Sequence, residues 1–269
     1  MARPDRPARP QHLLRVESND RLGPHLVRLR LSGDAVAGFP ETGYTDSYVK
    51  LVFVDPSLGL VPPYDVRELR ETLPADRQPV VRTYTVRSID RAAGTIDVDF
   101  VTHGDEGVAA PWAVRARPGD TIVANGPGGA YAPDPEAPFH LLVGDLSATP
   151  AIAAALEALP ATATGLALIE IHDPADELPL THPDGVEVRW LLNPSDEEGV
   201  LTAAVAEATW PEGTQVFAHG ERGAMKEIRA IFRDRAVPRE ALSISAYWAR
   251  GRTEDAFQAE KREPIGQID

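Results

Sequence analysis

The sequence contains no cysteine, and this absence excludes several kinds of chemistry at once. Disulfide bonds, thiolate zinc sites, iron–sulfur clusters and cysteine nucleophiles all require the missing thiol. Electron transfer by this chain would therefore need an organic cofactor or a partner protein. The histidines His172, His182 and His219 are too scattered along the chain to indicate a metal site, so we expect none.

Long apolar runs are also missing, because no stretch approaches the ~20 residues that a membrane helix needs. The first ten residues place Arg3, Arg6 and Arg9 among prolines, with no apolar segment behind them. This is not the pattern of a signal peptide. We expect a flexible tail over residues 1–10, no membrane insertion, and a cytoplasmic protein that is a monomer.

Positive charge is in short supply, since the formal net charge is −14. Binding to nucleic acid needs a basic face, so that class of function is disfavoured. An anionic small molecule would need a local basic pocket that overcomes the overall field.

The first half of the chain has the sequence pattern of a β-barrel. Short strands are predicted over residues 11–18, 25–31, 48–54, 80–87, 95–102 and 121–124. In the fifth of these, Ile96, Val98 and Phe100 alternate with Asp97 and Asp99, the period of a half-buried strand. Six short strands with Gly and Pro between them predict a closed antiparallel barrel. The loop over residues 55–79 is long, which often indicates a functional segment.

The pattern changes after the proline-rich stretch 132–139. Strands over residues 140–144, 166–172, 186–192, 215–219 and 242–249 alternate with helices that begin near residue 149 and span 200–208 and 221–235. Thr149 is expected to cap its helix, with Pro150 at the first helical position. This alternation predicts a doubly wound parallel sheet. We expect a barrel domain over residues 11–133 and an α/β domain over 134–269, the order found in flavin reductases of the ferredoxin-reductase type.

The strongest local motif is VRTYTVRS at residues 81–88. Arg82 and Tyr84 share one face of the strand because side chains alternate. The fork of Arg82 suits a pyrophosphate, the ring of Tyr84 suits an isoalloxazine, and Thr85 suits a hydrogen bond near flavin N5 or O4. An ordinary Thr/Val-rich strand with solvent-facing arginines is the alternative interpretation.

A second motif, DFVTHGDEGVAAPW, spans residues 99–112. A strand ends at Thr102 and His103, two glycines follow, and a short helix begins near Val108. Free backbone N–H groups from Val108 to Ala110 would attract a phosphate. The alternatives are a plain strand-to-helix turn, with His103 in a structural role.

Five motifs in this order, RTYTVR, DFVTHGDEGVAAPWA, GPGGAY, GDLSATPAI and AYWARGRTED, closely resemble the siderophore-interacting family of FAD-dependent ferric-siderophore reductases. The resemblance covers roughly residues 11–262. It implies FAD in the barrel domain, NADH or NADPH as electron donor on the α/β domain, and a ferric siderophore over the exposed flavin edge. A ferredoxin is the other electron donor that we considered.

The resemblance also assigns residues. Besides Arg82, Tyr84 and Thr85, the positions expected to bind the cofactors are Thr102, His103, Val108, Ala109, Ala110, Trp112, Asp145, Ser147, Tyr247 and Trp248. Tyr247 and Trp248 are expected to shield the flavin face as the C-terminal segment returns to it; core packing is the alternative. Leu146 stands where the family usually has a glutamate, and Ala110 where it usually has a serine.

For the substrate, the resemblance points to basic residues, here Lys50, Arg250 and Lys261. A motif usually written GPRG reads GPGG, so Gly128 replaces an arginine expected to face the siderophore. A tris-catecholate iron complex carries about three negative charges, and each lost partner would cost ~1–3 kcal/mol. We therefore expect a less anionic siderophore, such as a hydroxamate or a mixed-ligand compound.

These observations predict an enzyme that passes electrons from NAD(P)H through FAD to siderophore-bound Fe(III), two ferric complexes per hydride, and so releases Fe(II). No catalytic side chain is expected, because the cofactor carries the chemistry. Two alternatives stay open: a flavin reductase of the same fold with another acceptor, such as a ferredoxin or a quinone, and a protein that binds a siderophore without turnover.

Overall fold

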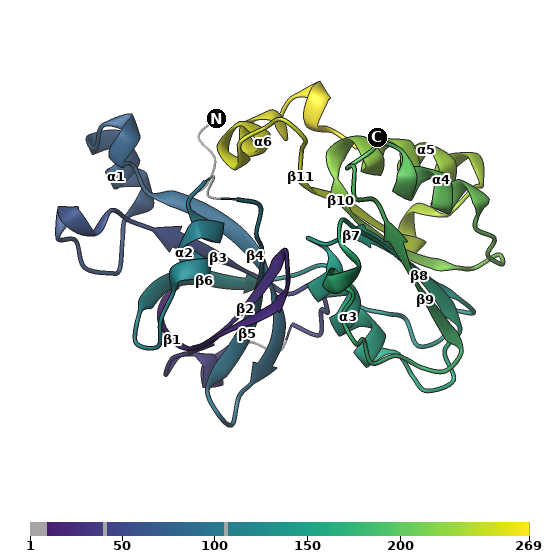
Figure 1. Cartoon of the computed structure of the whole chain (residues 1–269), viewed down its shortest axis with the longest axis horizontal. Helices are drawn as coiled ribbons and strands as arrows, with labels where there is room; N and C mark the ends of the chain where they lie inside the picture. Colours follow the sequence, from purple (N-terminus) through teal and green to yellow (C-terminus); the bar gives the residue numbers. More distant parts are fainter. Residues whose placement is uncertain (1–9, 40–41, 105–106, 269) are drawn as a thin grey trace.

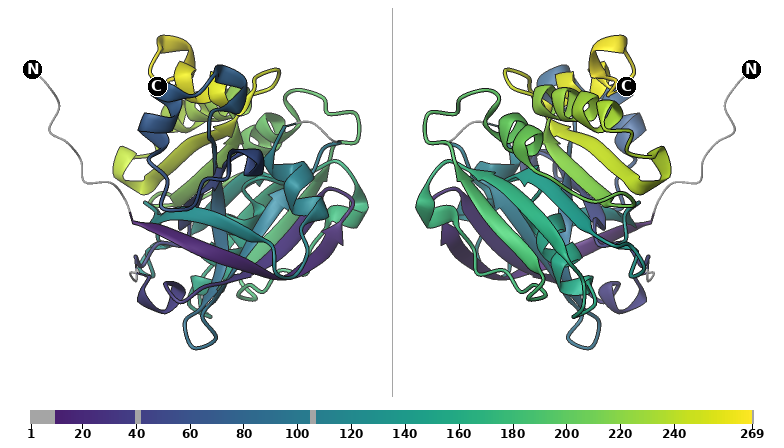
Figure 2. Two further views of the ribbon diagram at one scale, coloured as in Figure 1. Left: turned by 90° about the vertical axis from the view of Figure 1, so that its left-hand side faces the viewer. Right: turned by 90° about the vertical axis from the view of Figure 1, so that its right-hand side faces the viewer.

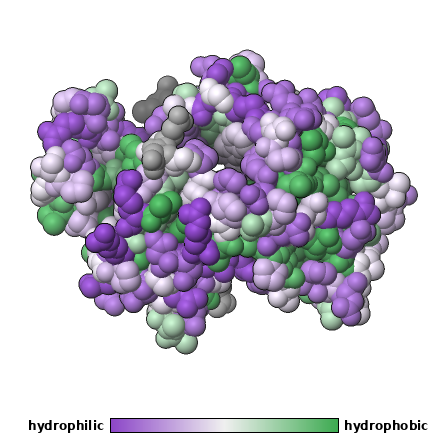
Figure 3. Space-filling view, viewed as in Figure 1, coloured by the Kyte–Doolittle hydropathy of each residue, from purple (hydrophilic) through white to green (hydrophobic). Residues whose placement is uncertain are grey.

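The computed structural model describes residues 10–39, 42–104 and 107–268 of the chain. A barrel built from the first half lies beside a layered α/β domain built from the second half (Figure 1). The tail expected over residues 1–10 lies outside the described residues, apart from Pro10. The face drawn in Figure 3 is mostly hydrophilic, with apolar residues in scattered patches.

The barrel is closed and antiparallel, as predicted. Its strands run in the order β1-β2-β5-β4-β3-β6, and β1 pairs with β6 to close the ring. Fully buried side chains such as Leu14, Leu29 and Phe100 fill the interior. The bounds are β1 (Gln11–Gly23), β2 (Leu26–Ser32), β3 (Tyr48–Phe53), β4 (Val80–Asp90), β5 (Thr95–Val101) and β6 (Thr121–Gly128).

The polar side of β5 is covered by ion pairs. Asp97 and Asp99 are both buried, although the alternating pattern indicated that they face outward. Arg28 donates to Asp99 through Nε at 2.6 Å and Nη2 at 2.8 Å, and Arg30 pairs with Asp97 through Nε at 2.9 Å. The arginine stems cover the carboxylates, so these acids lie inside the protein while their partners reach solvent.

The long segment before β4 is an arm with structure of its own. It holds η2 (Pro56–Leu58), α1 (Val66–Thr72) and η3 (Ala75–Arg77). The Asp65 carboxylate caps α1 by accepting from the backbone N–H groups of Arg67 and Glu68. None of the residues of α1 is buried. The arm projects from the barrel at the same end of the molecule as the C-terminal helix α6 (Glu254–Glu260) (Figures 1 and 2).

The α/β domain is a five-stranded parallel sheet with helices on both faces, which confirms the doubly wound prediction. The strand order is β11-β10-β7-β8-β9. Helix α3 packs on one face, and α4 and α5 pack on the other. The bounds are β7 (His140–Asp145), α3 (Thr149–Ala158), β8 (Gly165–Ile171), η4 (Pro174–Asp176), β9 (Val186–Leu192), α4 (Val200–Glu207), β10 (Gln215–Glu221), α5 (Arg222–Asp234), η5 (Arg239–Ala241), β11 (Leu242–Trp248) and η6 (Pro264–Gly266).

The predicted start of α3 is wrong by one residue. Ala148 occupies the N-cap position, and Thr149 is already helical. The Thr149 hydroxyl donates to the carbonyl of Asp145 at 3.3 Å, so it does not cap the helix. The cause is the tight turn before the helix, in which Ala148 N–H also bonds to the Asp145 carbonyl at 3.0 Å.

Several contacts join the domains, two of them through ion pairs. Arg87 on β4 forms a bidentate ion pair with Glu157 on α3. In the turn before β2, His25 donates its backbone N–H to the fully buried Asp176, at 2.9 Å, and its Nδ1 lies 2.6 Å from the same carboxylate. Strand β4 is therefore fixed against the α/β domain. No helix among residues 10–39, 42–104 and 107–268 is long and apolar enough to cross a membrane.

Candidate functional site

The motif strand β4 lies beside a group of packed aromatic rings. The centroid of the half-buried Tyr84 ring is 4.3 Å from that of Phe100 on β5, and burial raises the pKa of Tyr84. Trp112 on α2 (Ala109–Arg115) packs against Phe100 and Phe53, with ring centroids 6.1 Å and 5.6 Å apart. These contacts hold β4 and α2 against the same rings and restrict the motion of the Tyr84 ring.

The start of α2 leaves backbone donors without a side-chain cap. Val108 occupies the N-cap position, and its side chain has no acceptor. Ala109 and Ala110 follow as buried residues. Thr102, at the end of β5, is also buried and donates its N–H to the His25 carbonyl at 2.8 Å, whereas His103 is exposed. Residues 105 and 106 of this motif lie outside the described residues.

Arg82 makes an ion pair that the sequence did not suggest. Its Nη1 and Nη2 lie 3.2 Å and 3.1 Å from the two carboxylate oxygens of Asp255 on α6. The side chain of Arg82 is 16 % exposed and that of Asp255 is 65 % exposed, so the pair opens to solvent on the helix side. Glu254 adds a second acid beside it, and burial raises the pKa of Glu254. Helix α6 thus brings two carboxyl groups to the arginine of the motif.

Two of the three predicted substrate residues, Lys50 and Lys261, interact electrostatically. Lys50 on β3 donates to the Thr83 hydroxyl at 3.1 Å. Lys261 follows α6 and lies 4.5 Å from the centroid of the Phe257 ring. Partial desolvation lowers the pKa of Lys261, and the nearby charge of Lys50 lowers it further, against the attraction of Glu254. The two lysines therefore form a local basic site between the barrel and the C-terminal segment.

The third predicted substrate residue, Arg250, is engaged elsewhere. Its guanidinium forms a bidentate pair with Asp196, and its Nε is 3.7 Å from Glu198. The ring of Trp248 lies beneath it, 5.9 Å from the guanidinium carbon to the ring centroid. Since two acids offset its charge, Arg250 adds little positive potential to the site of Lys50 and Lys261.

Gly128 lies directly under the ring of Tyr48. A Cβ atom at position 128 would be 2.7 Å from Cζ and 2.8 Å from Oη of Tyr48. Tyr48 is paired with both Gly128 and Thr85 across the barrel strands, and its ring centroid lies 5.9 Å from Lys50 Nζ. The phenol thus fills the space into which a side chain at position 128 would extend.

Asp145 ties three strand ends together at the carboxyl edge of the sheet. Its Oδ1 accepts from the N–H and the hydroxyl of Ser147, and its Oδ2 accepts from Glu221 N–H and Trp248 Nε1, both at 2.8 Å. Burial raises the pKa of Asp145 and these hydrogen bonds oppose the rise. All four donors point at the carboxylate, so the arrangement fits the ionised form. Both oxygens are occupied by protein groups.

Tyr247 connects the motif strand to the α/β domain. Burial raises the pKa of Tyr247, and the hydroxyl of the buried Thr85 beside it opposes the rise. Its ring meets that of His219 edge-on at 5.0 Å, and His219 stacks on Phe217 at 3.9 Å. Burial lowers the pKa of His219 to about 3, so this imidazole is neutral. Tyr247 is thus packed between β4 and the α/β domain.

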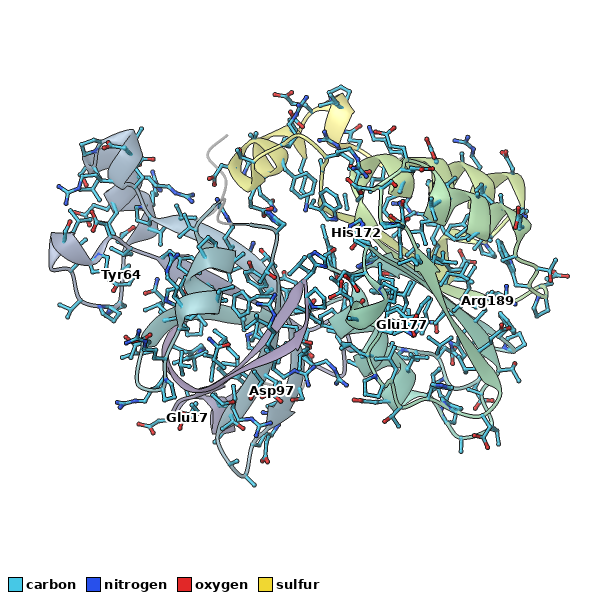
Figure 4. The ribbon with its side chains drawn as sticks, in the orientation of Figure 1. Glu17, Tyr64, Asp97, His172, Glu177 and Arg189 are labelled. Atoms are coloured by element: carbon cyan, nitrogen blue, oxygen red, sulfur yellow. The ribbon has the colours of Figure 1, made fainter. Side chains whose placement is uncertain are left out.

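The sequence analysis predicted that the scattered histidines form no metal site. The part of the chain that the structure describes holds no group of three or more His, Asp or Glu side chains arranged to bind a metal. His172, labelled in Figure 4, follows β8, and its Nδ1 lies 2.9 Å from the Asn193 carbonyl. Asp97 and Glu17 lie at the lower end of the barrel in this view, away from α6.

Sequence reasoning missed Asp255, Glu254 and Tyr48. A helix-start signal was available for the first two, since Thr253 caps α6 through Ala256 N–H and two acids occupy its first turn. The contact between Asp255 and Arg82 spans 173 residues. The position of Tyr48 over Gly128 depends on how β3 pairs with β6.

Comparisons with known proteins agree with this geometry. A family model described as "Siderophore-interacting FAD-binding domain" matches residues 15–131, and one described as "Siderophore-interacting protein" matches residues 137–251. The ferric vibriobactin reductase ViuB of Vibrio cholerae is 33 % identical over 245 residues, which cover 88 % of this chain and 89 % of the relative. The chain belongs to the siderophore-interacting protein family.

Another relative and two solved structures match as well. An NADPH-dependent ferric-chelate reductase of Escherichia coli is 32 % identical, covering 88 % of this chain and 91 % of the relative. The crystal structure of the siderophore-interacting protein SipS from Aeromonas hydrophila superposes with a TM-score of 0.80 at 28 % identity, over 97 % of this chain and 99 % of that one. A ferredoxin reductase of carbazole 1,9a-dioxygenase, at 17 % identity and a TM-score of 0.65 over 91 % of this chain and 71 % of that one, shows the same fold.

The residues of the barrel fit the flavin that its family implies. The half-buried phenol ring of Tyr84 packs on Phe100, Arg82 lies two residues before it on the same strand, and α2, which begins without a side-chain cap, packs on Phe100 through Trp112. These are the donor types that a diphosphate and a flat aromatic ring system require. The side chains of Arg82, Tyr84 and Thr85 on β4, together called the β4 cradle, therefore have the chemistry to bind FAD.

Proposed function

We propose that this chain is a FAD-dependent ferric-siderophore reductase, which passes electrons from NAD(P)H or a ferredoxin through FAD to siderophore-bound Fe(III) and releases Fe(II). One observation carries the proposal: the β4 cradle of Arg82, Tyr84 and Thr85 lies next to the basic site of Lys50 and Lys261. A flavin held by the first would have its acceptor bound close by. The names of two relatives, a ferric vibriobactin reductase and an NADPH-dependent ferric-chelate reductase, support the same activity.

In this proposal the barrel binds and orients the cofactor. Arg82 and the N–H groups of Ala109 and Ala110 hold the diphosphate, Tyr84 packs along the flavin, and Thr85 supplies a hydrogen bond at its polar edge. Trp112 holds α2 in place, and Thr102 and His103 form the adjoining turn. FAD supplies the conversion of a two-electron donor into one-electron steps. The side chains need not move protons, so none is assigned as catalytic.

The two lysines select the substrate. In a chain of net charge −14, Lys50 and Lys261 provide the local positive charge that an anionic iron complex needs. Arg250 is paired with Asp196, and position 128 carries no side chain. We therefore propose a siderophore of low negative charge, a hydroxamate or a mixed-ligand type. A clear preference for tris-catecholates in binding titrations would contradict this assignment.

The α/β domain is the proposed docking site for the nicotinamide donor. Its carboxyl edge carries Asp145, Ser147, Tyr247 and Trp248, the residues expected there from the family resemblance. Asp145 acts mainly by fixing Ser147, Glu221 and Trp248 in position. We propose that the protein works in the cytoplasm as a monomer, with a reduced ferredoxin as the other donor to be tested.

The direct test is the visible spectrum of the purified protein, followed by anaerobic addition of NADH, NADPH or reduced ferredoxin. We expect a flavin spectrum that one of these donors bleaches, and recovery of the colour when a ferric siderophore is added. Steady-state rates with ferric siderophores should exceed those with a quinone or an oxidised ferredoxin as acceptor. A colourless protein that still binds a ferric siderophore would support non-catalytic binding instead.

A further inference from the structure

Arg82 has two candidate anionic partners, one proposed and one observed. The proposed function gives it the diphosphate of FAD, whereas the structure pairs both of its terminal nitrogens with Asp255. Nη1 also donates to the Val81 carbonyl at 3.0 Å, which further limits the free donors of the guanidinium. A carboxylate and a phosphate both present two oxygens to the same face of an arginine fork. The two anions are therefore rivals for one group.

Helix α6 is fastened to the α/β domain, so Asp255 is held close to Arg82. Phe257 is 1 % exposed and packs with Ala246 and Ala249. Glu260 accepts from Arg222 Nη1 at 2.5 Å and from Arg252 Nε at 2.7 Å. None of these anchors involves the barrel. Because they do not depend on the partner of Arg82, the negative charge of Asp255 faces any anion that binds there.

The ion pair itself is easy to replace. The side chain of Asp255 is 65 % exposed, and exposed ion pairs contribute little to stability. A diphosphate carries more negative charge than a carboxylate, so it is the stronger partner for a guanidinium. FAD would thus displace Asp255 from Arg82 at a cost in affinity, without unfolding α6.

We propose that Asp255 sets the affinity for FAD: its carboxylate competes with the flavin diphosphate for Arg82, so that α6 weakens cofactor binding and allows exchange. The proposal rests on the proposed function, because it needs FAD at β4. It predicts that removing the charge of Asp255 improves the binding of phosphate-bearing flavins alone. Riboflavin lacks phosphate and serves as the matched ligand.

The experiment is a fluorescence titration of the flavin-free full chain with FAD and with riboflavin. Asp255→Asn should bind FAD about two- to fivefold more tightly than the unmodified chain, the range that an exposed ion pair controls. Its affinity for riboflavin should not change. Asp234→Asn is the control, since Asp234 is 78 % exposed on α5 and the substitution changes the net charge equally. It should leave both affinities unchanged.

A double substitution separates competition from a general charge effect. In an Arg82→Ala chain, Asp255→Asn should give a clearly smaller gain in FAD affinity. An unchanged or weaker affinity of Asp255→Asn for FAD would overturn the proposal, as would an equal gain for riboflavin or a full gain without Arg82. Thermal melts of each variant establish that it is folded. If the unmodified, folded chain takes up no FAD, the proposed function fails, and this inference fails with it.

Discussion

At position 128 the absence of a side chain decides which neighbour borders the proposed substrate site. The ring of Tyr48 covers Gly128 so closely that any Cβ atom there would lie 2.7 Å from it. Tyr48 is half-buried and ends in a flexible ring, which could swing away from a larger residue. The pair formed by Tyr48 and Gly128 therefore controls both the shape and the charge next to Lys50.

Gly128→Arg tests this control of charge. The substitution should displace the Tyr48 ring and add a guanidinium beside Lys50, and so raise affinity for a ferric tris-catecholate about tenfold, since each charged partner contributes ~1–3 kcal/mol. Affinity for an uncharged ferric hydroxamate should not rise. Gly128→Gln is the control, because it moves the ring without adding charge. Equal gains for Gln and Arg, measured with intact iron complexes, would contradict the electrostatic explanation.

The buried His219 affects how the stability of the protein depends on pH. Its ring is 4 % exposed, its Nδ1 has no partner among the described residues, and burial lowers its pKa to about 3. In the unfolded chain the imidazole takes up a proton near its ordinary value of 6.5. As pH falls from there towards 3, the unfolded state binds more protons, and stability decreases.

His219→Phe should therefore reduce the loss of stability in acid. Between pH 7 and pH 5 the unmodified protein should lose about 2 kcal/mol more of its unfolding free energy than the variant does. Urea denaturation at a series of pH values measures this difference. The absolute stability of the variant is not the test, because it also loses the bond between Nε2 and Ser243. If the unfolding free energies of the unmodified protein and the variant changed equally with pH, His219 would not take up a proton on unfolding.

At the scale of elements, Asp145 joins the ends of β7, β10 and β11. The sequence motif indicated a cofactor contact, whereas the structure gives both oxygens to protein donors from Ser147, Glu221 and Trp248. A buried carboxylate with all its acceptor positions in use acts chiefly by positioning its neighbours.

Asp145→Asn should therefore destabilise the protein. The amide group would face donors that need an acceptor, and a buried donor left without one costs about 1–3 kcal/mol. Ser147→Ala removes only the hydroxyl bond and should cost less. Thermal denaturation distinguishes the two variants. An Asp145→Asn protein of normal stability that no longer accepts electrons from NADH or NADPH would instead indicate direct contact with the nicotinamide.

The elements with strong periodicity could be predicted from sequence. All six barrel strands and all five parallel strands lie where alternation or apolar runs indicated them. The short helices α1 and α6 were not predicted, because seven residues give little periodicity. The start of α3 was misplaced because the turn that precedes it depends on the bonds of Asp145.

For the whole molecule, the site is assembled from segments far apart in sequence. Arg82 and Asp255 are separated by 173 residues, and Arg87 and Glu157 by 70. The local motif at residues 81–88 predicted a cofactor-binding strand, and the family resemblance pointed to Lys50 and Lys261; both stay predictions. Local patterns gave no information on the pairing of Arg250 with Asp196 or of Arg82 with Asp255, because such contacts arise only when the barrel, the α/β sheet and α6 pack together.

The account depends most on the binding of FAD by β4. The most direct measurement is a titration of the flavin-free full chain with FAD, followed by flavin fluorescence, beside the same titration of Arg82→Ala. We predict saturation at an equimolar amount of FAD for the unmodified chain, and binding weaker by about tenfold or more for the variant, because it loses a charge-assisted fork. A folded chain that takes up no FAD, or an Arg82→Ala variant that binds it equally well, would contradict the account.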